Sequence, residues 1–248
     1  MSAGRVISRG YQAGLSGRVI GQGYRVRLLI YGDSNSWGYL DDGSGRRHGD
    51  RWPVVMAREL ASRGKPVQLI EECLPGRTSN TDDPLEGAVF NGATPLHAIL
   101  LSQQPLDHIL IMLGTNDMKA RFGRDADAIC VGSMSLVSLC ADTPTGPGGW
   151  AATAATPVTV ICPVMLGQRA EDPAWERFEE WRGGRATSRA LPPVLASACG
   201  SAGVGFIDAN RFAASSDIDP IHWAADTHRT FGKAIADHIK ADDMMADL

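Results

Sequence analysis

The chain has 248 residues, of which 44% are hydrophobic and 21% are charged, a composition typical of a folded globular protein. This length is enough for one well-buried core, so a single domain is the default interpretation. The formal net charge is −4 and no basic cluster is present, which argues against nucleic acid as a partner because phosphate binding needs clustered lysine and arginine. We expect a small neutral ligand instead.

The sequence also excludes several other classes. No segment reaches the roughly 18 consecutive apolar residues of a membrane span, and the start of the chain lacks the apolar core of a signal peptide. We therefore predict a cytoplasmic protein without a membrane partner. The cysteines are scattered and form no C-x-x-C pair, which argues against a disulfide framework or a zinc site. We interpret them as reduced, mostly buried thiols: Cys73, Cys130, Cys140, Cys162 and Cys199.

Residues 1–25 contain two similar phrases, GRVISRGYQ and GRVIGQGYR, and have little apolar periodicity. Two copies are too few for a repeat fold, which needs about three units. We interpret residues 1–25 as an extension outside the core, with an oligomer contact as one role for it, and residues 26–248 as one domain.

From residue 26 onward, short apolar runs alternate with segments of helical character. The apolar runs predict strands at 26–32, 67–72, 108–114, 158–165 and 204–209. Helices are expected at 51–64, 94–104, 126–142, 186–200 and 228–242. Continuous apolar runs indicate strands that are covered on both faces, so the pattern predicts a three-layer α/β/α sandwich with a central parallel five-stranded sheet.

Two kinds of segment interrupt this pattern. Pro192 and Pro193 fall inside the helix at 186–200, and because proline breaks helix hydrogen bonds we expect that helix to start there or to be broken. Two Gly/Pro/Ala-rich stretches, 82–95 and 142–157, predict long loops, which in compact domains are often binding loops or contacts.

Candidate site residues follow four of the predicted strands. Ser34 comes after the first strand, Gly76 after the second, Asn116 after the third, and Asp219 and His222 after the fifth. Ligands of open α/β sheets bind outside the carboxyl ends of the strands, so we expect these residues to meet at one rim.

This set of residues fits the needs of acyl transfer. A serine nucleophile needs a base, the base needs a carboxylate that fixes its tautomer, and the developing oxyanion needs fixed donors. Ser34 is the candidate nucleophile, His222 the base and Asp219 its partner. The candidate oxyanion donors are the backbone N–H groups of Ser34 and Gly76 and the side-chain amide of Asn116. The alternative for Ser34 is an ordinary turn serine.

In these residues the chain resembles the SGNH hydrolases, also called GDSL-type esterases. The resemblance rests on four blocks in order: GDSN at 32–35, the glycine loop at Gly76, GTND at 114–117 and DPIH at 219–222. It implies a flavodoxin-like sheet and the same catalytic and oxyanion roles as above. One departure is Asn35, where the family's motif carries leucine.

A closer similarity is to the arylesterase/acyltransferase subgroup, in GDS..WG at 32–38, IEE.L..RT.N.DDP at 70–84 and QPLDHILIMLGTND.KA.F at 104–122. This resemblance implies a homo-oligomer, in that subgroup an octamer, with a restricted hydrophobic channel in which an alcohol competes with water for the acyl-enzyme. The extension and residues 143–184 are not covered by it.

Aromatic side chains near the blocks are candidates for substrate binding. Trp37 and Tyr39 follow the nucleophile closely and Trp223 follows His222, so we assign all three to the pocket, with core packing as the alternative.

Other polar residues have competing interpretations. His228 is a rival base to His222. Half of a metal site is one alternative for Asp226 with His228, but we favour a helix N-cap role for Asp226 or Thr227 and expect no metal and no cofactor. We expect Asp117 to brace its loop.

The leading hypothesis is a serine esterase that hydrolyses short-chain, acetyl-type esters through an acyl-enzyme and also transfers the acyl group to alcohols. The alternatives are a carbohydrate acetyl esterase, a noncatalytic binding module on the same fold, and a phospho-acceptor domain built on Asp33, Asp117 and Lys119.

Overall fold

The computed structural model describes residues 26–239. The predicted extension and the last residues of the predicted domain, 240–248, lie outside the described residues. Within the described part, no helix combines the length and the apolar character needed to cross a membrane.

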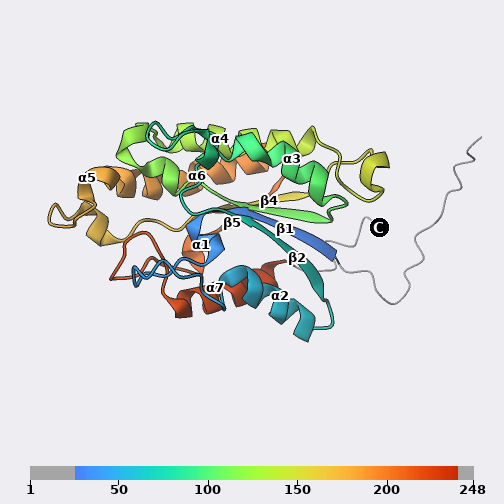
Figure 1. Ribbon diagram of the computed structural model, residues 1–248, viewed down its shortest axis with the longest axis horizontal. Helices are drawn as coiled ribbons and strands as arrows, with labels where there is room; N and C mark the ends of the chain where they lie inside the picture. The colour runs from blue at the N-terminus through green and yellow to red at the C-terminus, as the bar shows by residue number, and fades with distance from the viewer. Residues whose placement is uncertain (1–25, 240–248) are drawn as a thin grey trace, which may run out of the picture.

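Five parallel strands form one sheet in the order β2-β1-β3-β4-β5, which confirms the predicted sheet (Figure 1). The strands are β1 (Val26–Gly32), β2 (Val67–Cys73), β3 (His108–Met112), β4 (Val158–Cys162) and β5 (Gly205–Asp208). Strand β1 lies between β2 and β3 and pairs with both, so that Leu28 aligns with Leu69 of β2 and with His108 of β3.

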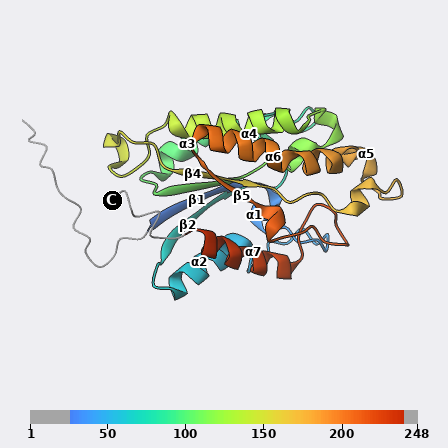
Figure 2. The same cartoon turned by 180° about the vertical axis from the view of Figure 1, so that it is seen from behind.

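Helices cover both faces of this sheet. They are α1 (Ser34–Trp37), α2 (Trp52–Ser62), α3 (Ala93–Gln103), α4 (Ala126–Ala141), α5 (Phe178–Trp181), α6 (Gly184–Ala202) and α7 (Ala225–His238). Helices α3, α4 and α6 lie on one face, and α2 and α7 pack together on the other, as Figure 1 and the view from behind in Figure 2 show. The molecule is therefore the predicted three-layer sandwich.

Successive residues of β1 enter opposite halves of the core, which explains why its sequence is continuously apolar. Leu29 and Tyr31 belong to the cluster under α3, α4 and α6, whereas Leu28 and Ile30 belong to the cluster under α2 and α7. All four side chains are fully buried. Burying each such side chain stabilises the fold by roughly 1.5–3 kcal/mol.

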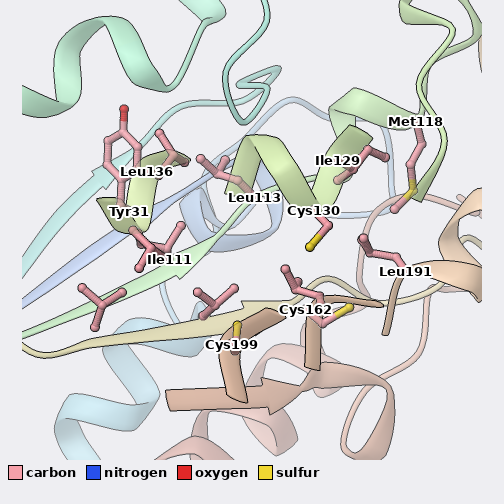
Figure 3. Packing of buried hydrophobic residues seen from close by; sticks show 14 of the residues in the cluster. Tyr31, Ile111, Leu113, Met118, Ile129, Cys130, Leu136, Cys162, Leu191 and Cys199 are labelled. Carbon is pink, nitrogen blue, oxygen red and sulfur yellow. The ribbon is translucent and has the colours of Figure 1, made fainter. Parts of the chain in front are cut away.

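The cysteines are free thiols that pack in or beside the core. Cys130, Cys140, Cys162 and Cys199 are buried and Cys73 is half-buried, and Figure 3 shows three of them among the apolar side chains of the larger cluster. Burial raises the pKa of Cys140 to about 12 and that of Cys199 to about 11. These groups therefore stay protonated and unreactive at neutral pH.

Helix α6 continues through Pro192 and Pro193, so the expected start or break at these prolines is wrong. Leu191, Leu195 and Cys199 recur every four residues on its inner face and are fully buried. The prolines lie outside this buried stripe. Packing of the inner face therefore outweighs the hydrogen bonds that the two prolines cannot donate.

Candidate active site

Ser34, His222 and Asp219 form a continuous chain of hydrogen-bonding groups. His222 Nε2 lies 3.2 Å from Ser34 Oγ, and His222 Nδ1 lies 2.6 Å from Asp219 Oδ2. Ser34 is 4% exposed and His222 is 9% exposed, so little water competes for these contacts. The fold thus brings together three residues that come from two ends of the chain.

The turn after β1 fixes the orientation of Ser34. Asp33 caps the N-terminus of α1 by accepting a hydrogen bond from the Asn35 N–H at 3.0 Å. Gly38 ends the helix with a φ of 94°, and a Cβ at this position would lie 2.8 Å from Arg51 Cβ. A sharp strand-to-helix turn therefore holds Ser34 as the first residue of α1, at the carboxyl end of β1.

Asp33 is fully buried directly behind Ser34. Burial raises the pKa of this carboxyl to about 6, although the Asn35 N–H and the Thr115 hydroxyl partly oppose the shift. Asp33 is consequently a group that takes up a proton in mildly acidic solution.

The turn at Asp219 positions its carboxylate for His222. Asp219 Oδ1 accepts hydrogen bonds from the N–H groups of Ile221 at 2.8 Å and His222 at 3.3 Å, which leaves Oδ2 for the imidazole. Burial acts to raise the pKa of Asp219, but the hydrogen bond and charge of His222 together with these N–H groups outweigh burial and lower it. Asp219 is therefore ionised at neutral pH and favours a proton on Nδ1 of His222.

Asn116 reaches the glycine loop that follows β2. Its Nδ2 donates to the backbone carbonyl of Arg77 at 3.1 Å, immediately after Gly76. The same loop is tied to the end of β1, because the Leu74 N–H donates to the carbonyl of Gly32 at 3.0 Å. The structure thus joins the segments that carry the three predicted oxyanion donors.

Gly76 has a φ of 90°, a conformation that favours glycine. A Cβ here would lie 3.0 Å from the ring of Phe90, so this ring packs directly over the glycine. The sequence analysis missed Phe90, although an aromatic residue inside the predicted loop at 82–95 was a usable signal.

The prediction that Asp117 braces its loop is confirmed. Its carboxylate accepts hydrogen bonds from the Ser79 N–H at 2.8 Å and the Ser79 hydroxyl at 2.5 Å, and it pairs with Arg124 at 3.0 Å. These contacts join the loop after β3 to the loop after β2, which stabilises the relative position of Asn116 and Gly76.

Two of the three aromatic residues assigned to substrate binding lie beside the site. The rings of Tyr39 and His222 stack with centroids 4.4 Å apart, and Trp37 follows at 6.4 Å from Tyr39. Both aromatics are only half-buried. Arg47 lies over the Trp37 ring at 5.4 Å.

The structure does not bring Trp223 to this surface, which corrects its assignment. Trp223 is fully buried, and its ring packs edge-on against Phe231 of α7 at 5.0 Å. Because the residue after His222 points inward under α7, its side chain fills the core instead of lining a pocket.

Two further interpretations of the last segment are resolved by the geometry. His228 is fully buried against Trp223, and burial lowers its pKa to about 3, whereas His222 contacts Ser34. The N-cap role is wrong, because α7 has Ala224 as N-cap without a side-chain hydrogen bond, while Asp226 pairs with Arg229 within the first turn. Within residues 26–239, no group of three or more His, Cys, Asp or Glu side chains is arranged to hold a metal.

A network of charges connects the loops around the site, and the sequence analysis did not foresee it. Arg121, shortly after Asn116, lies 2.5 Å from Asp83 and 3.4 Å from Glu180 of α5. Lys119 Nζ lies 3.7 Å from the same Glu180. The segment at 143–184 is thereby attached to the loops that carry the site.

Comparison with known proteins gives a consistent family and fold. Residues 30–230 match the GDSL-like lipase/acylhydrolase family. The native aryl esterase of M. smegmatis is 32% identical, with a TM-score of 0.77 and coverage of 86% of this chain and 98% of that chain. A carbohydrate acetylesterase from Sinorhizobium meliloti is 32% identical, with a TM-score of 0.77 and coverage of 87% and 98%. Comparison with curated protein sequences finds no match.

A more distant solved structure shares the fold. The lipase/acylhydrolase from Enterococcus faecalis is 16% identical over 86% of this chain and 95% of that chain, with a TM-score of 0.60. This likeness concerns the architecture alone.

Proposed function

The chain belongs to the GDSL-like lipase/acylhydrolase family, and from this premise we propose that it is a serine esterase that cleaves short-chain, acetyl-type carboxylic esters through an acyl-enzyme. The observation that carries the proposal is the unbroken chain of contacts from Ser34 through His222 to Asp219. A serine hydroxyl beside an oriented imidazole is the arrangement that nucleophilic catalysis needs.

In the acylation step, Ser34 Oγ attacks the carbonyl carbon of the ester while His222 Nε2 accepts the hydroxyl proton. The electron pair of the carbonyl moves to its oxygen and forms a tetrahedral oxyanion. When this intermediate collapses, the bond to the alcohol breaks and His222 returns the proton to the departing oxygen. Asp219 stabilises the imidazolium that exists between these two transfers.

The oxyanion is stabilised by the N–H groups of Ser34 and Gly76 and by the side-chain amide of Asn116. Each donor of this kind contributes about 3–4 kcal/mol to the transition state in well-studied serine enzymes. The hydrogen bond from Asn116 to the carbonyl of Arg77 fixes the amide at the glycine loop before substrate arrives. Donors that are already in position need no reorganisation during the reaction.

In the second half-reaction, His222 removes a proton from water and the resulting oxygen attacks the acyl-enzyme. An alcohol that enters in place of water would give a new ester, so the proposal includes acyl transfer. No metal or cofactor takes part in either half of this scheme.

Aromatic side chains support a preference for short acyl groups. The ring of Phe90 packs over Gly76, and the ring of Tyr39 packs against His222. These rings leave limited room around the oxyanion donors and the base. The 32% identity with a carbohydrate acetylesterase supports an acetyl group.

A second candidate is deacetylation of sugars or oligosaccharides. The half-buried rings of Trp37 and Tyr39 beside His222 favour it, because flat aromatic surfaces pack well against the apolar faces of sugar rings. The carbohydrate acetylesterase from Sinorhizobium meliloti, at 32% identity, supports it as well. In either case we propose that the enzyme acts as a homo-oligomer, which light scattering on the purified chain would test.

The function is tested by initial rates with p-nitrophenyl acetate, butyrate and octanoate, with and without a primary alcohol. Wild type is compared with Ser34→Ala and with Ser201→Ala, an exposed serine at the end of α6. We expect fast acetate hydrolysis that is lost only in Ser34→Ala, and new ester when alcohol is present. Absence of any Ser34-dependent rate, together with no labelling of Ser34 by a phosphonate, would favour the noncatalytic binding module.

A further inference from the structure

A cavity of about 240 Å³ is lined by Asp219 together with residues that have no role in the proposed reaction. Three separate segments form it: the loop at 41–43, the segment at 169–177 and residues 218–219. We propose that this cavity is a subsite for the alcohol part of the ester, and that it takes a neutral, hydroxyl-rich group such as a single sugar ring. The inference rests on the proposed esterase function and names the substrate class.

The cavity walls carry both signs of charge. Asp41, Asp42, Glu176 and Asp219 supply carboxylates, and Arg169 and Arg177 supply guanidinium groups. Two of the carboxylates already have partners, because Asp42 lies 4.0 Å from Arg46 and Asp219 holds His222. A carboxylate only accepts hydrogen bonds and a guanidinium only donates them, whereas a hydroxyl does both. A ligand with several hydroxyls can therefore satisfy both kinds of wall at once.

Other ligand classes fit these walls less well. An anion would meet the carboxylates of Asp41 and Glu176, and a cation would meet the guanidinium groups of Arg169 and Arg177. An acyl chain would remove water from these charges without replacing its hydrogen bonds, which is unfavourable. A neutral polyol is repelled by neither kind of charge, and its hydroxyls replace the hydrogen bonds of the water that it displaces.

The two arginines are held in place before any ligand binds. Arg169 donates to the carbonyl of Ile218 at 2.5 Å and lies 3.5 Å from Glu176. Arg177 pairs with Glu180 at 2.9 Å and lies over the ring of Trp175 at 5.9 Å. A guanidinium has five N–H donors, so these contacts orient each group and still leave donors for a ligand. Such preorganisation lowers the entropic cost of binding.

The size and the apolar wall also suit a ring. Drug-sized ligands occupy pockets of about 300–1,000 Å³, so a cavity of about 240 Å³ matches a smaller group. Ile218 lines the cavity and is 63% exposed, which gives the C–H face of a sugar an apolar surface to contact.

The location links the cavity to the reaction. Asp219 lines the cavity and also holds His222, which contacts Ser34. Only His222 stands between Asp219 and Ser34, with one hydrogen-bonding contact to each of them. His222 returns its proton to the departing alcohol, so the alcohol part of the ester must lie near His222, whose partner Asp219 lines this cavity.

The test compares two acetate esters that differ only in the alcohol: phenyl acetate and a monoacetylated methyl glucoside. The variants are Asp41→Asn with Glu176→Gln, which keep size but remove charge. The matched control is Asp82→Asn with Glu86→Gln on the exposed part of the loop after β2. We expect the ratio of kcat/KM for the glucoside over phenyl acetate to fall about tenfold in the cavity variant, mainly through KM, and to stay unchanged in the control.

A binding arm separates this inference from the proposed function. Methyl glucoside is titrated into Ser34→Ala with and without the cavity substitutions, and saturation-transfer NMR measures its contact with the protein. Contact that disappears with the cavity substitutions supports the subsite. Turnover of phenyl acetate with no glucoside contact, or an unchanged kcat/KM ratio, would overturn the subsite and leave the esterase intact. No Ser34-dependent turnover of either ester would overturn the esterase itself and the subsite with it.

Discussion

Asn35 donates its side-chain amide to the backbone carbonyl of Ile221 at 3.0 Å, so the residue after Ser34 is tied to the residue before His222. The contact is buried and joins segments separated by 186 positions in the chain. It lies where the family's motif carries leucine, a side chain that cannot make this bond. In this protein a hydrogen bond therefore fixes the separation of nucleophile and base.

Replacing Asn35 by leucine keeps the size of the side chain and removes the bond. We expect kcat to fall about tenfold, which is about 1.4 kcal/mol in activation free energy, with little change in KM. The reason is that Ser34 and His222 would be less well aligned, whereas the substrate contacts would stay the same. Steady-state kinetics measures the split, and urea unfolding serves as the control for a loss of fold. An unchanged kcat would mean that packing alone positions the two segments.

The proposed roles of His222 and Asp219 predict unequal losses. His222→Ala removes the base, so we expect a loss of about 10⁶-fold in kcat, whereas Asp219→Asn leaves an imidazole in the site and is expected to lose about 10⁴-fold. Single-turnover rates with p-nitrophenyl acetate measure both. His97→Ala, an exposed histidine on α3, is the control. Full activity of His222→Ala would refute the assignment.

Two glycines with similar positive φ angles separate backbone strain from catalysis. Gly76 has a φ of 90° and Gly87 a φ of 82°, so alanine at either position strains the backbone and destabilises the fold by about 1–3 kcal/mol. The new Cβ meets Phe90 at position 76 but no atom within 4 Å at position 87. We expect both variants to unfold at lower urea concentration and only Gly76→Ala to lose about 100-fold in kcat, through a displaced oxyanion donor. Equal kcat in the two variants would remove Gly76 from that role.

Buried histidines predict how stability depends on pH. Burial lowers the pKa of His228 to about 3 and that of His108 to about 4, from an ordinary value of 6.5. The unfolded chain then binds protons that the folded chain does not, so the free energy of unfolding falls as pH drops below 6.5, by up to about 1.4 kcal/mol per pH unit for each histidine.

Asp33, with its pKa raised to about 6, acts in the opposite direction between pH 6 and 4, because there the folded chain binds the extra proton. Urea unfolding of wild type at pH 7, 6 and 5 measures the net slope. In His228→Leu the number of protons taken up on unfolding in acid is expected to be smaller by about one, so the free energy of unfolding falls less steeply as pH drops. His97→Leu is expected to leave this slope unchanged. An equal slope in His228→Leu and wild type would contradict the prediction.

The sequence was most informative where one physical constraint dominated. Strands buried on both faces must be apolar along their length, so β1 was predicted at its observed bounds. The rule that polar residues gather at the carboxyl ends of parallel strands located Ser34, Asn116 and His222 in separate loops, and the structure brings the segments that carry them together.

The sequence was less informative where neighbours distant in the chain decide the outcome. Trp223 and Tyr39 are both aromatic residues within a few positions of a site residue in the sequence, but only packing under α7 determines that Trp223 is buried. Pro193 suggested a helix break because a local sequence pattern does not show how much the packing of the buried face of α6 stabilises the helix. The charge contacts of Arg121 with Asp83 and Glu180 join three loops and have no sequence signature.

The buried thiols provide a direct readout of how the core opens. Cys140 of α4, Cys162 of β4 and Cys199 of α6 are all fully buried in the layer that Figure 3 shows in part. A water-soluble disulfide reagent can reach them only during transient opening, so its rate of reaction in native buffer reports the free energy of that opening. Mass spectrometry of the modified peptides would then show whether α4 and α6 detach from the sheet together or one at a time.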